Sequence, residues 1–402
     1  MNRPALLKKN FSKIFWITAL VNVKVVNVVM SLFYVHRGIT LSQIFTLAIL
    51  WSVVNMIFEV PSSYLADRWG RKKTIIVGIL GSMMYWSIFL FAHSFVMFAI
   101  GVACYAFSIA MLSGTQEALL YDTGKELDKE KDNIKELGKF HSSLSLFKII
   151  TPIIAVLIAK DMSEIQFMIL ILIDVIATSI ALFISSTLIE ARHVMDVEKI
   201  ERGVLLDAWK LIRTNRYLLS GIISKIGIFI AFLVTWQYYH TFFTNMGVSI
   251  IILGFGWGLN HLVIFLVQRN IGKYISHMRI PLALDILNTI FTATIILFVC
   301  LLLLVPQHPY LLYACFLASV SFEAWRNPLY SQFFNGQSHS YNRATTLSLS
   351  NFLKSVLDIP VLLLAAILIE KDVRLPYVLA CVISLIIITF FRLSSKKQPL
   401  HI

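Results

Sequence analysis

Charged residues are scarce in this chain of 402 residues. Asp, Glu, Lys and Arg make up 14% of it and hydrophobic residues 58%, whereas ordinary soluble domains contain roughly 25% charged residues. A soluble fold of this size could not bury so much apolar surface. The apolar residues also form nearly uncharged runs that reach about 20 residues, the length that a helix needs to cross a hydrocarbon core. These runs predict membrane-spanning helices and an all-α membrane protein.

Twelve such runs follow one another along the chain. The charged segment 190–216 separates the first six runs from the last six. We therefore predict twelve transmembrane helices in two pseudo-symmetric six-helix bundles, 1–189 and 217–402, with a cytoplasmic linker at 190–216. The predicted spans are 11–35, 41–65, 74–92, 96–120, 140–159, 165–189, 217–240, 248–267, 281–305, 310–330, 346–369 and 375–391.

Cysteine is also scarce, and no catalytic pattern accompanies it. The four cysteines, Cys104, Cys300, Cys315 and Cys381, fall inside predicted spans without the spacing of metal ligands. The chain has no glycine-rich phosphate loop, no local Ser-His-Asp or Cys-His signature and no metal-spaced histidine cluster. We expect no enzyme activity, no cofactor and no metal. Because a nucleotide site is missing, energy must come from a solute or ion gradient, which indicates a secondary carrier.

Acidic residues are outnumbered, with 22 Asp and Glu against 35 Lys and Arg, and the net charge is +13. Most cations lie in alternate loops of the predicted layout, and the other loops hold only Arg37, Lys160, Lys371 and Arg374. Cationic loops stay in the cytoplasm, so we expect a multi-pass protein of the cell inner (plasma) membrane with both termini cytoplasmic. The first span is too long for a cleavable signal peptide. Anionic lipid head groups account for the basic loops without nucleic acid.

The two halves match each other at rare positions. One offset aligns Glu117 with Glu323 and Lys148 with Lys354. Ionisable residues are rare within membranes, so their coincidence in the fourth and tenth spans, and in the fifth and eleventh, indicates a duplicated six-helix unit.

The loop between the second and third predicted spans carries a compact charged motif. Residues 63–73 read Ser-Tyr-Leu-Ala-Asp-Arg-Trp-Gly-Arg-Lys-Lys. This loop resembles the Gly-x-x-x-Asp-Arg-x-Gly-Arg-Lys motif of the major facilitator superfamily, with serine in place of the first glycine. The resemblance implies a gating motif that joins the two halves on the cytoplasmic side, formed by Asp67, Arg68, Gly70, Arg71 and Lys72. The alternative is that these cations only set topology, but topology requires no Asp or Gly at fixed offsets.

Three further segments resemble a drug-efflux branch of that superfamily. They are 58–61 (Phe-Glu-Val-Pro), 113–122, which ends at Asp122, and 343–345, which begins at Arg343. Asp122 and Arg343 join the predicted gating residues, and the resemblance implies efflux by antiport. Two departures weaken proton-coupled export: the span 96–120 has no arginine, and the glycine-rich motif of the fifth span is reduced to Thr151-Pro152.

Polar and ionisable side chains within the predicted spans are candidates for substrate binding or proton coupling. A charge at the bilayer centre costs at least about 2.5 to 3.5 kcal/mol and requires a partner or a wet cavity. The candidates are Lys24, Asn27, Asn55, Glu59, Glu117, Lys148, Asp174, Lys225, Trp236, Glu323, Arg326, Lys354 and Asp358.

Some of these candidates have structural alternatives. Lys354 and Asp358 are four residues apart, and Glu323 and Arg326 are three apart, so each pair could neutralise itself on its own helix. Glu59 and Glu117 lie near the cytoplasmic ends of their helices and could serve the gating motif instead. The aromatic stripe that includes Trp236 could be packing.

Three lysines lack an acid within four residues on their own helices, so their partners must come from other helices, a substrate or water. They are Lys24, which would share a helix face with Asn27 and Ser31, Lys148 and Lys225. In the fold that the resemblance implies, the first and seventh helices line the central cavity. There, Lys24 and Lys225 would favour an anionic or electron-rich substrate. Asp174 could be their counter-ion, or a structural partner of Lys148.

Three functions remain open. The first is proton-coupled export of a small amphipathic solute by alternating access. The second is uptake or facilitated passage of an anionic metabolite. The third is a non-transporting membrane receptor built on a carrier fold. The expected partners are a small-molecule substrate, protons and the lipid bilayer, and we expect a monomer.

Overall fold

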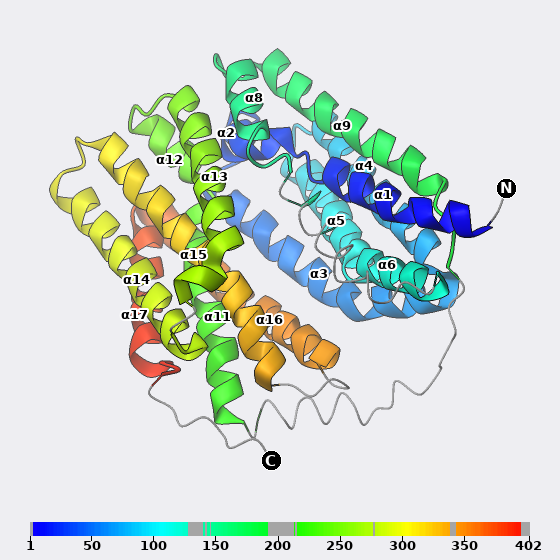
Figure 1. Ribbon diagram of the computed structural model, residues 1–402. Coiled ribbons are helices and arrows are strands. Elements are labelled where there is room, and N and C mark those ends of the chain that lie inside the picture. The colour runs from blue at the N-terminus through cyan, green and yellow to red at the C-terminus, as the bar shows by residue number, and fades with distance from the viewer. Residues whose placement is uncertain are drawn as a thin grey trace. The chain divides into compact units, whose positions relative to one another are not determined.

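The computed structural model describes residues 3–127, 140, 143–144, 146–191, 213, 215–275, 278–337 and 343–394. All regular structure within these residues is helical (Figure 1). Nine helical stretches among them are long and apolar enough to cross a membrane, and Leu375–Phe390 is a shorter apolar helix. The predicted all-α membrane fold is confirmed. The chain forms two compact units: unit 1 is Met1–Asp196 with Ile250–Gly258, and unit 2 is Val197–Ser249 with Leu259–Ile402. Most of the predicted linker, 190–216, lies outside the described residues.

Unit 1 packs its helices around an aromatic core. Helix α4 lies against α5 and α9, α3 lies against α5, and α1 lies against α9. The core includes Phe33, Trp86, Phe89 and Phe98, which are all buried. The helices are α1 (Arg3–Val21), η1 (Val25–Val29), α2 (Met30–His36), α3 (Leu41–Trp69), α4 (Arg71–Phe91), α5 (Phe95–Leu112), α6 (Thr115–Glu126), α8 (Thr151–Ile158) and α9 (Glu164–Ser186).

Polar residues at the start of two helices of unit 1 explain where those helices begin. The Thr40 hydroxyl accepts a hydrogen bond from the Gln43 backbone amide, and the Gln43 side-chain oxygen accepts one from the Thr40 amide, which makes a capping box for α3. Ser163 and Gln166 form the same arrangement before α9. Each box satisfies amide groups that have no partner inside the helix.

Unit 2 is arranged around α11 and α14. Helix α11 packs against α15, α16 and α17, and α14 packs against α15 and α17. Helix α11 approaches α17 so closely that a Cβ atom on Gly227 would lie 2.4 Å from Ile387 Cδ1, a contact that small residues permit. The helices are α11 (Arg216–Trp236), α12 (Tyr239–Asn245), α13 (Ile250–Ile275, whose first turns belong to unit 1), α14 (Ile280–Leu304), α15 (Pro309–Gln337), α16 (Arg343–Lys371) and α17 (Leu375–Phe390).

Four spans that the sequence predicts as continuous are interrupted, among them 140–159, where turns at 146–150 precede the short helix α8. The first breaks at Lys24, whose φ of 44° lies in the left-handed region. The fourth breaks at Gly114, with φ of 70°. The seventh breaks between Trp236 and Tyr239. Hydropathy reports length and polarity but not backbone conformation, so the predicted continuity was wrong at these points.

Candidate functional site

The turn after α3 brings the predicted gating residues to one end of unit 1. Gly70 has a φ of 97°, which favours glycine, and a Cβ atom there would lie 3.1 Å from the Glu190 carboxyl group. The Glu190 carboxylate accepts hydrogen bonds from the Arg71 and Lys72 amides, each at 2.8 Å. A carboxylate at the first turn of α4 is also favoured by the helix dipole. The segment that follows α9 is thereby fixed to the start of α4.

Two predicted gating residues form an ion pair beside this turn. Arg71 Nε lies 2.5 Å from Asp122 Oδ2, and both side chains are largely buried. Arg68 is exposed. The side chains of Asp67 and Arg343 lie outside the described residues, so their gating roles stay predictions. The turn therefore connects α4 to α6 within unit 1.

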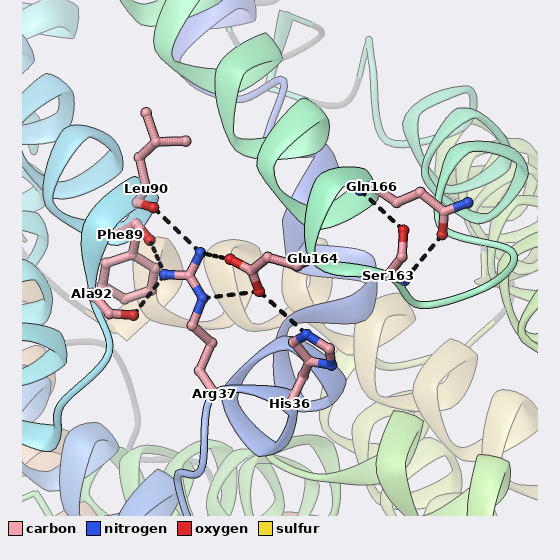
Figure 2. Close-up of polar contacts among 8 residues, drawn as sticks. All are labelled: His36, Arg37, Phe89, Leu90, Ala92, Ser163, Glu164 and Gln166. Carbon is pink, nitrogen blue, oxygen red and sulfur yellow. Dashed lines mark hydrogen bonds and ion pairs between the residues drawn. The ribbon is translucent and has the colours of Figure 1, made fainter.

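A second charged cluster lies where α4 ends and α9 begins (Figure 2). The buried Arg37 guanidinium donates hydrogen bonds to the carbonyl oxygens of Ala92 at 2.6 Å and of Phe89 and Leu90 at 3.3 Å. It also pairs with Glu164 at the start of α9. A cation at the last carbonyls of α4 is favoured by the helix dipole. Sequence reasoning treated Arg37 only as a loop cation and missed this role.

The break in the first span is held by a buried carboxylate. Asp174 of α9, which is 1% exposed, accepts hydrogen bonds from the amides of Val25 at 2.8 Å and Val26 at 3.1 Å. These amides open η1 and have no partner within it. Both carboxylate oxygens thus bind backbone amides, and the pairing of Asp174 with Lys148 stays a prediction.

Two lysines gather near this break. Lys24 Nζ donates to Asn22 Oδ1 at 3.2 Å and lies 5.3 Å from the centre of the Tyr105 ring. We expected the partner of Lys24 to come from another helix, a substrate or water, and did not foresee that a neighbouring asparagine of the same span would accept a hydrogen bond from it. Lys148 is exposed and close enough to Lys24 for the two charges to repel each other. Because the helix breaks at Lys24, the predicted face shared by Lys24, Asn27 and Ser31 does not form.

The remaining candidate site residues of unit 1 belong to neither of these charged clusters. Asn27, Asn55, Glu59 and Glu117 are half-buried. Asn55 Oδ1 has no hydrogen-bond partner among the described residues. Their assignment to substrate binding, proton coupling or gating stays a prediction.

In unit 2 a buried network surrounds Arg326. Its Nη1 donates to Asn288 Oδ1 at 2.9 Å, and its Nη2 lies 3.2 Å from Glu323 Oε1. Asn288 and Tyr330 both donate to the Ser224 hydroxyl oxygen, at 3.0 and 2.9 Å. The predicted pairing of Glu323 with Arg326 is present, and the network links α11, α14 and α15. Arg326 repels the Lys225 ammonium and Glu323 attracts it.

Two lysines of unit 2 lie over aromatic rings. Lys225 Nζ is 5.3 Å from the centre of the Phe334 ring, and Lys354 Nζ is 4.6 Å from that of Phe229. Lys354 also pairs with Asp358 at 2.7 Å, as the spacing predicted. Lys225 is half-buried, and the positive charge of Lys354 repels its ammonium group.

The aromatic stripe of the seventh span forms a chain of ring contacts. The ring centres of Phe229 and Phe232 are 6.4 Å apart, those of Phe232 and Trp236 5.9 Å, and those of Trp236 and Tyr239 4.9 Å. Trp236 is half-buried and Tyr239 fully buried. This arrangement favours the packing interpretation for most of the stripe.

Two acidic residues that are not among the predicted site residues lie in different environments, one buried and one in a turn. Asp285 of α14 accepts hydrogen bonds from the Leu393 and Ser394 amides, at distances of 2.7 to 3.0 Å, and so fixes the chain that follows α17. Asp372 lies in the turn between α16 and α17, where hydrogen bonds from Arg374 hold the pKa of its carboxyl group below the usual range. Neither arrangement involves a group deep in the membrane.

Comparison with known proteins gives matches at two levels. Residues 16–361 match the family described as the Major Facilitator Superfamily. A stretch of 86 residues is 29% identical to the uncharacterized MFS-type transporter YxaM of Bacillus subtilis (strain 168), and covers 21% of this chain and 22% of that protein. The match thus spans about a fifth of that curated relative.

Solved transporter structures are similar along nearly the whole chain. The nucleoside transporter NupG is 14% identical, with a TM-score of 0.74 over 99% of this chain and 100% of that one. A D-xylose-proton symporter is 12% identical, with a TM-score of 0.69 over 98% and 99%. An inward-facing, unoccupied bacterial homolog of the human lysosomal transporter Spinster is 12% identical, with a TM-score of 0.69 over 100% of both chains. At such identities the likeness establishes the fold, which is that of a twelve-helix transporter.

Proposed function

Because the chain belongs to the major facilitator superfamily, whose members with this fold are secondary transporters and not enzymes, we propose that it carries a small molecule with an anionic or electron-rich group. The observation that carries this proposal is a set of three lysines in the predicted membrane-spanning segments that have no directly bonded carboxylate among the described residues. These lysines are Lys24, Lys148 and Lys225. A substrate anion would supply the missing partner.

The exposure of these lysines supports a role in binding. Lys148 is exposed, and Lys24 and Lys225 are half-buried. A lysine facing lipid in mid-membrane would cost at least about 2.5 to 3.5 kcal/mol, so such amines are expected to face a water-filled path. The rings of Tyr105 and Phe334 add cation–π contacts that hold the amines in place.

Both units contribute lysines to this set. In unit 1 Asp174 is close enough to Lys24 for the opposite charges to attract, while both of its oxygens accept hydrogen bonds from backbone amides. In unit 2 Arg326 and Lys354 each pair with a carboxylate on their own helix, and Lys225 is attracted by Glu323 without a direct bond to it among the described residues. Each unit would therefore offer a cation to a negatively charged substrate.

Export of an amphipathic solute by proton antiport is the second candidate. It is supported by the segments that resemble the drug-efflux branch and by the Arg71–Asp122 ion pair within them. Under either candidate we propose six-helix bundles at 1–189 and 217–402. We also propose that the protein lies in the inner membrane as a monomer, with both termini in the cytoplasm. Under antiport, energised uptake into inverted vesicles should collapse with a protonophore.

The proposal is tested by thermal stabilisation of the purified protein with matched ligands. The probes are phenylacetate, phenylacetamide and phenethylamine, with the corresponding set on a naphthalene scaffold. The carboxylates should stabilise the protein most, and Lys24→Gln or Lys225→Gln should remove that preference. Lys160→Gln is the matched control, because Lys160 is exposed in a loop. Equal stabilisation by acid, amide and amine, or a preference that survives in both variants, would refute the proposal.

A further inference from the structure

Three lysines gather where α9 ends and α4 begins, and we call Lys9, Lys13 and Lys72 the lysine cluster. Lys13 of α1 donates a hydrogen bond to the carbonyl oxygen of Thr187, the residue that follows α9. Lys9 of α1 and Lys72 of α4 are close enough to Lys13 to repel its ammonium group. Lys9 and Lys13 are also four residues apart on one helix, a spacing at which like charges destabilise the helix. The fold therefore holds a concentration of positive charge that an anion would stabilise.

Two acids at this end of unit 1 have other partners. The Glu190 carboxylate lies next to the cluster and accepts hydrogen bonds from the backbone amides of Arg71 and Lys72. The Glu126 carboxylate pairs with Arg3. Among the described residues, no carboxylate bonds to the ammonium groups of the lysine cluster. The cluster can therefore bind an anion that the chain itself does not supply.

An exposed apolar stripe of α9 leads directly to the lysine cluster. Its large apolar side chains recur at spacings of three and four residues, so they lie on one face of the helix. They are Ile165, Ile169, Leu172, Ile176, Ile180 and Phe183. Thr187 continues this face one turn after Phe183 and is the residue whose carbonyl oxygen binds Lys13. An exposed apolar face on a membrane-spanning helix contacts acyl chains, so the cluster lies where the acyl chains end and the head groups begin.

An exposed tryptophan lies at the same level on α1. The Trp16 side chain is 47% exposed, and it follows Lys13 by three residues, which places both on one side of the helix. Tryptophan is enriched at the interface between membrane and water, where its ring contacts acyl chains and its N–H reaches polar groups. Lysines on the outer side of such a ring lie at the depth of the lipid phosphate groups.

We propose that the lysine cluster is a binding site for the head group of an anionic phospholipid. The ammonium groups of Lys9, Lys13 and Lys72 bind the phosphate oxygens through charge-assisted hydrogen bonds, and an acyl chain of the same lipid lies along the α9 stripe and the Trp16 ring. Basic pockets between membrane helices bind anionic lipids in this way. The bound lipid links α1 to α4.

Two features distinguish this site from other ways of binding phosphate. The lysines come from two helices that the fold brings together, which is more specific than the general attraction of basic loops to a membrane surface. A soluble phosphate would use the lysines but not the apolar surface beside them. A zwitterionic lipid carries its own cation next to the phosphate, so it gains less from the cluster than a lipid with a net negative charge.

The test measures which lipid contacts Trp16 in the reconstituted full-length protein. Vesicles of phosphatidylcholine contain a small fixed fraction of lipid with brominated acyl chains, either phosphatidylglycerol or phosphatidylcholine. Bromine quenches indole fluorescence at short range. Because the chain has eight tryptophans, the Trp16 component is taken as the difference between each protein and its Trp16→Phe counterpart. Brominated phosphatidylglycerol should quench this component more strongly than brominated phosphatidylcholine, and equal quenching by the two lipids overturns the inference.

Lysine variants assign the preference to the cluster. Lys9→Gln and Lys13→Gln should each lower the affinity for phosphatidylglycerol relative to phosphatidylcholine about 5-fold, which corresponds to about 1 kcal/mol for a lysine near a membrane surface. Lys125→Gln is the matched control, because Lys125 is an exposed cation in the last turn of α6, and it should retain the preference. Lys9→Gln leaves the bond between Lys13 and Thr187 in place, so it serves as the test if Lys13→Gln fails to fold.

Three further results would overturn the site. A preference that survives in both cluster variants would mean that these lysines do not bind the lipid. An equal loss in Lys125→Gln would mean that general surface charge attracts it. Loss of the preference on addition of glycerol phosphate at constant ionic strength would mean that the cluster binds a soluble phosphate. Because no transport substrate is present, each result is independent of the proposed function.

Discussion

Removal of the Asp174 carboxylate should destabilise unit 1 at the break in its first span. Val25 and Val26 are almost fully buried, and their amides bond only to Asp174 among the described residues. An unsatisfied buried donor costs about 1–3 kcal/mol, so Asp174→Ala should lower the free energy of unfolding by about 2–6 kcal/mol. Asp174→Asn retains one acceptor and should lose about half as much.

The assay is denaturant unfolding of the purified protein in mixed micelles, with the wild type and variants compared under one condition. Ser179→Ala is the control, because Ser179 lies on the same helix and its hydroxyl donates to the Val175 carbonyl of its own helix. Ser179 is half-buried, and its hydroxyl also lies 3.7 Å from Met83 Sδ of α4, so this change should cost no more than about 1 kcal/mol. If Asp174→Ala unfolded like the control, the carboxylate would not hold the break, and the explanation of the first span would be wrong.

Three further changes have distinct expected outcomes. Arg71→Ala and Asp122→Asn remove the ion pair at 2.5 Å between two of the expected gating residues. If this pair forms in one conformational state only, as we propose, both variants should abolish transport in vesicles at normal membrane abundance. Normal transport by both would contradict this. Arg37→Gln should lower the free energy of unfolding by about 1.5–3 kcal/mol, because buried charged hydrogen bonds are lost. The control Arg374→Gln changes an exposed side chain and should cost less than about 1 kcal/mol. Equal losses of both variants in denaturant unfolding would refute the role of Arg37. Tyr330→Phe should cost about 1–3 kcal/mol, because it removes the bond that the hydroxyl donates to Ser224 and the one it accepts from Asn288. No loss would mean that the network is dispensable for stability.

Features that depend on local spacing were predictable from the sequence. Apolar length identified the helices. The pairs Lys354–Asp358 and Glu323–Arg326 form as their spacings of four and three residues indicate. These contacts lie on single helices, so the 3.6-residue period is sufficient to predict them.

Contacts between a carboxylate and backbone amides escaped prediction. Asp174 binds amides of the first span, Glu190 binds amides of α4, and Asp285 binds amides after α17. Each partner is a main-chain group that becomes available only because a helix starts or breaks there. Since no second polar side chain is involved, the sequence contains no pattern that could reveal the pair. Gly70 and Lys24 both have a positive φ. The glycine indicates a turn in the sequence, whereas nothing about a lysine predicts this backbone conformation.

The central claim is that amines in the membrane-spanning segments select a substrate with negative charge. The most direct measurement is equilibrium binding of phenylacetate and phenethylamine to the protein in nanodiscs, for the wild type, Lys24→Gln and Lys225→Gln. The account predicts that each variant binds the carboxylate more weakly by about 1–3 kcal/mol, which is roughly 5–150-fold, while binding of the amine is unchanged or stronger. Equal losses for acid and amine, or no loss for either, would contradict it and would make these lysines structural.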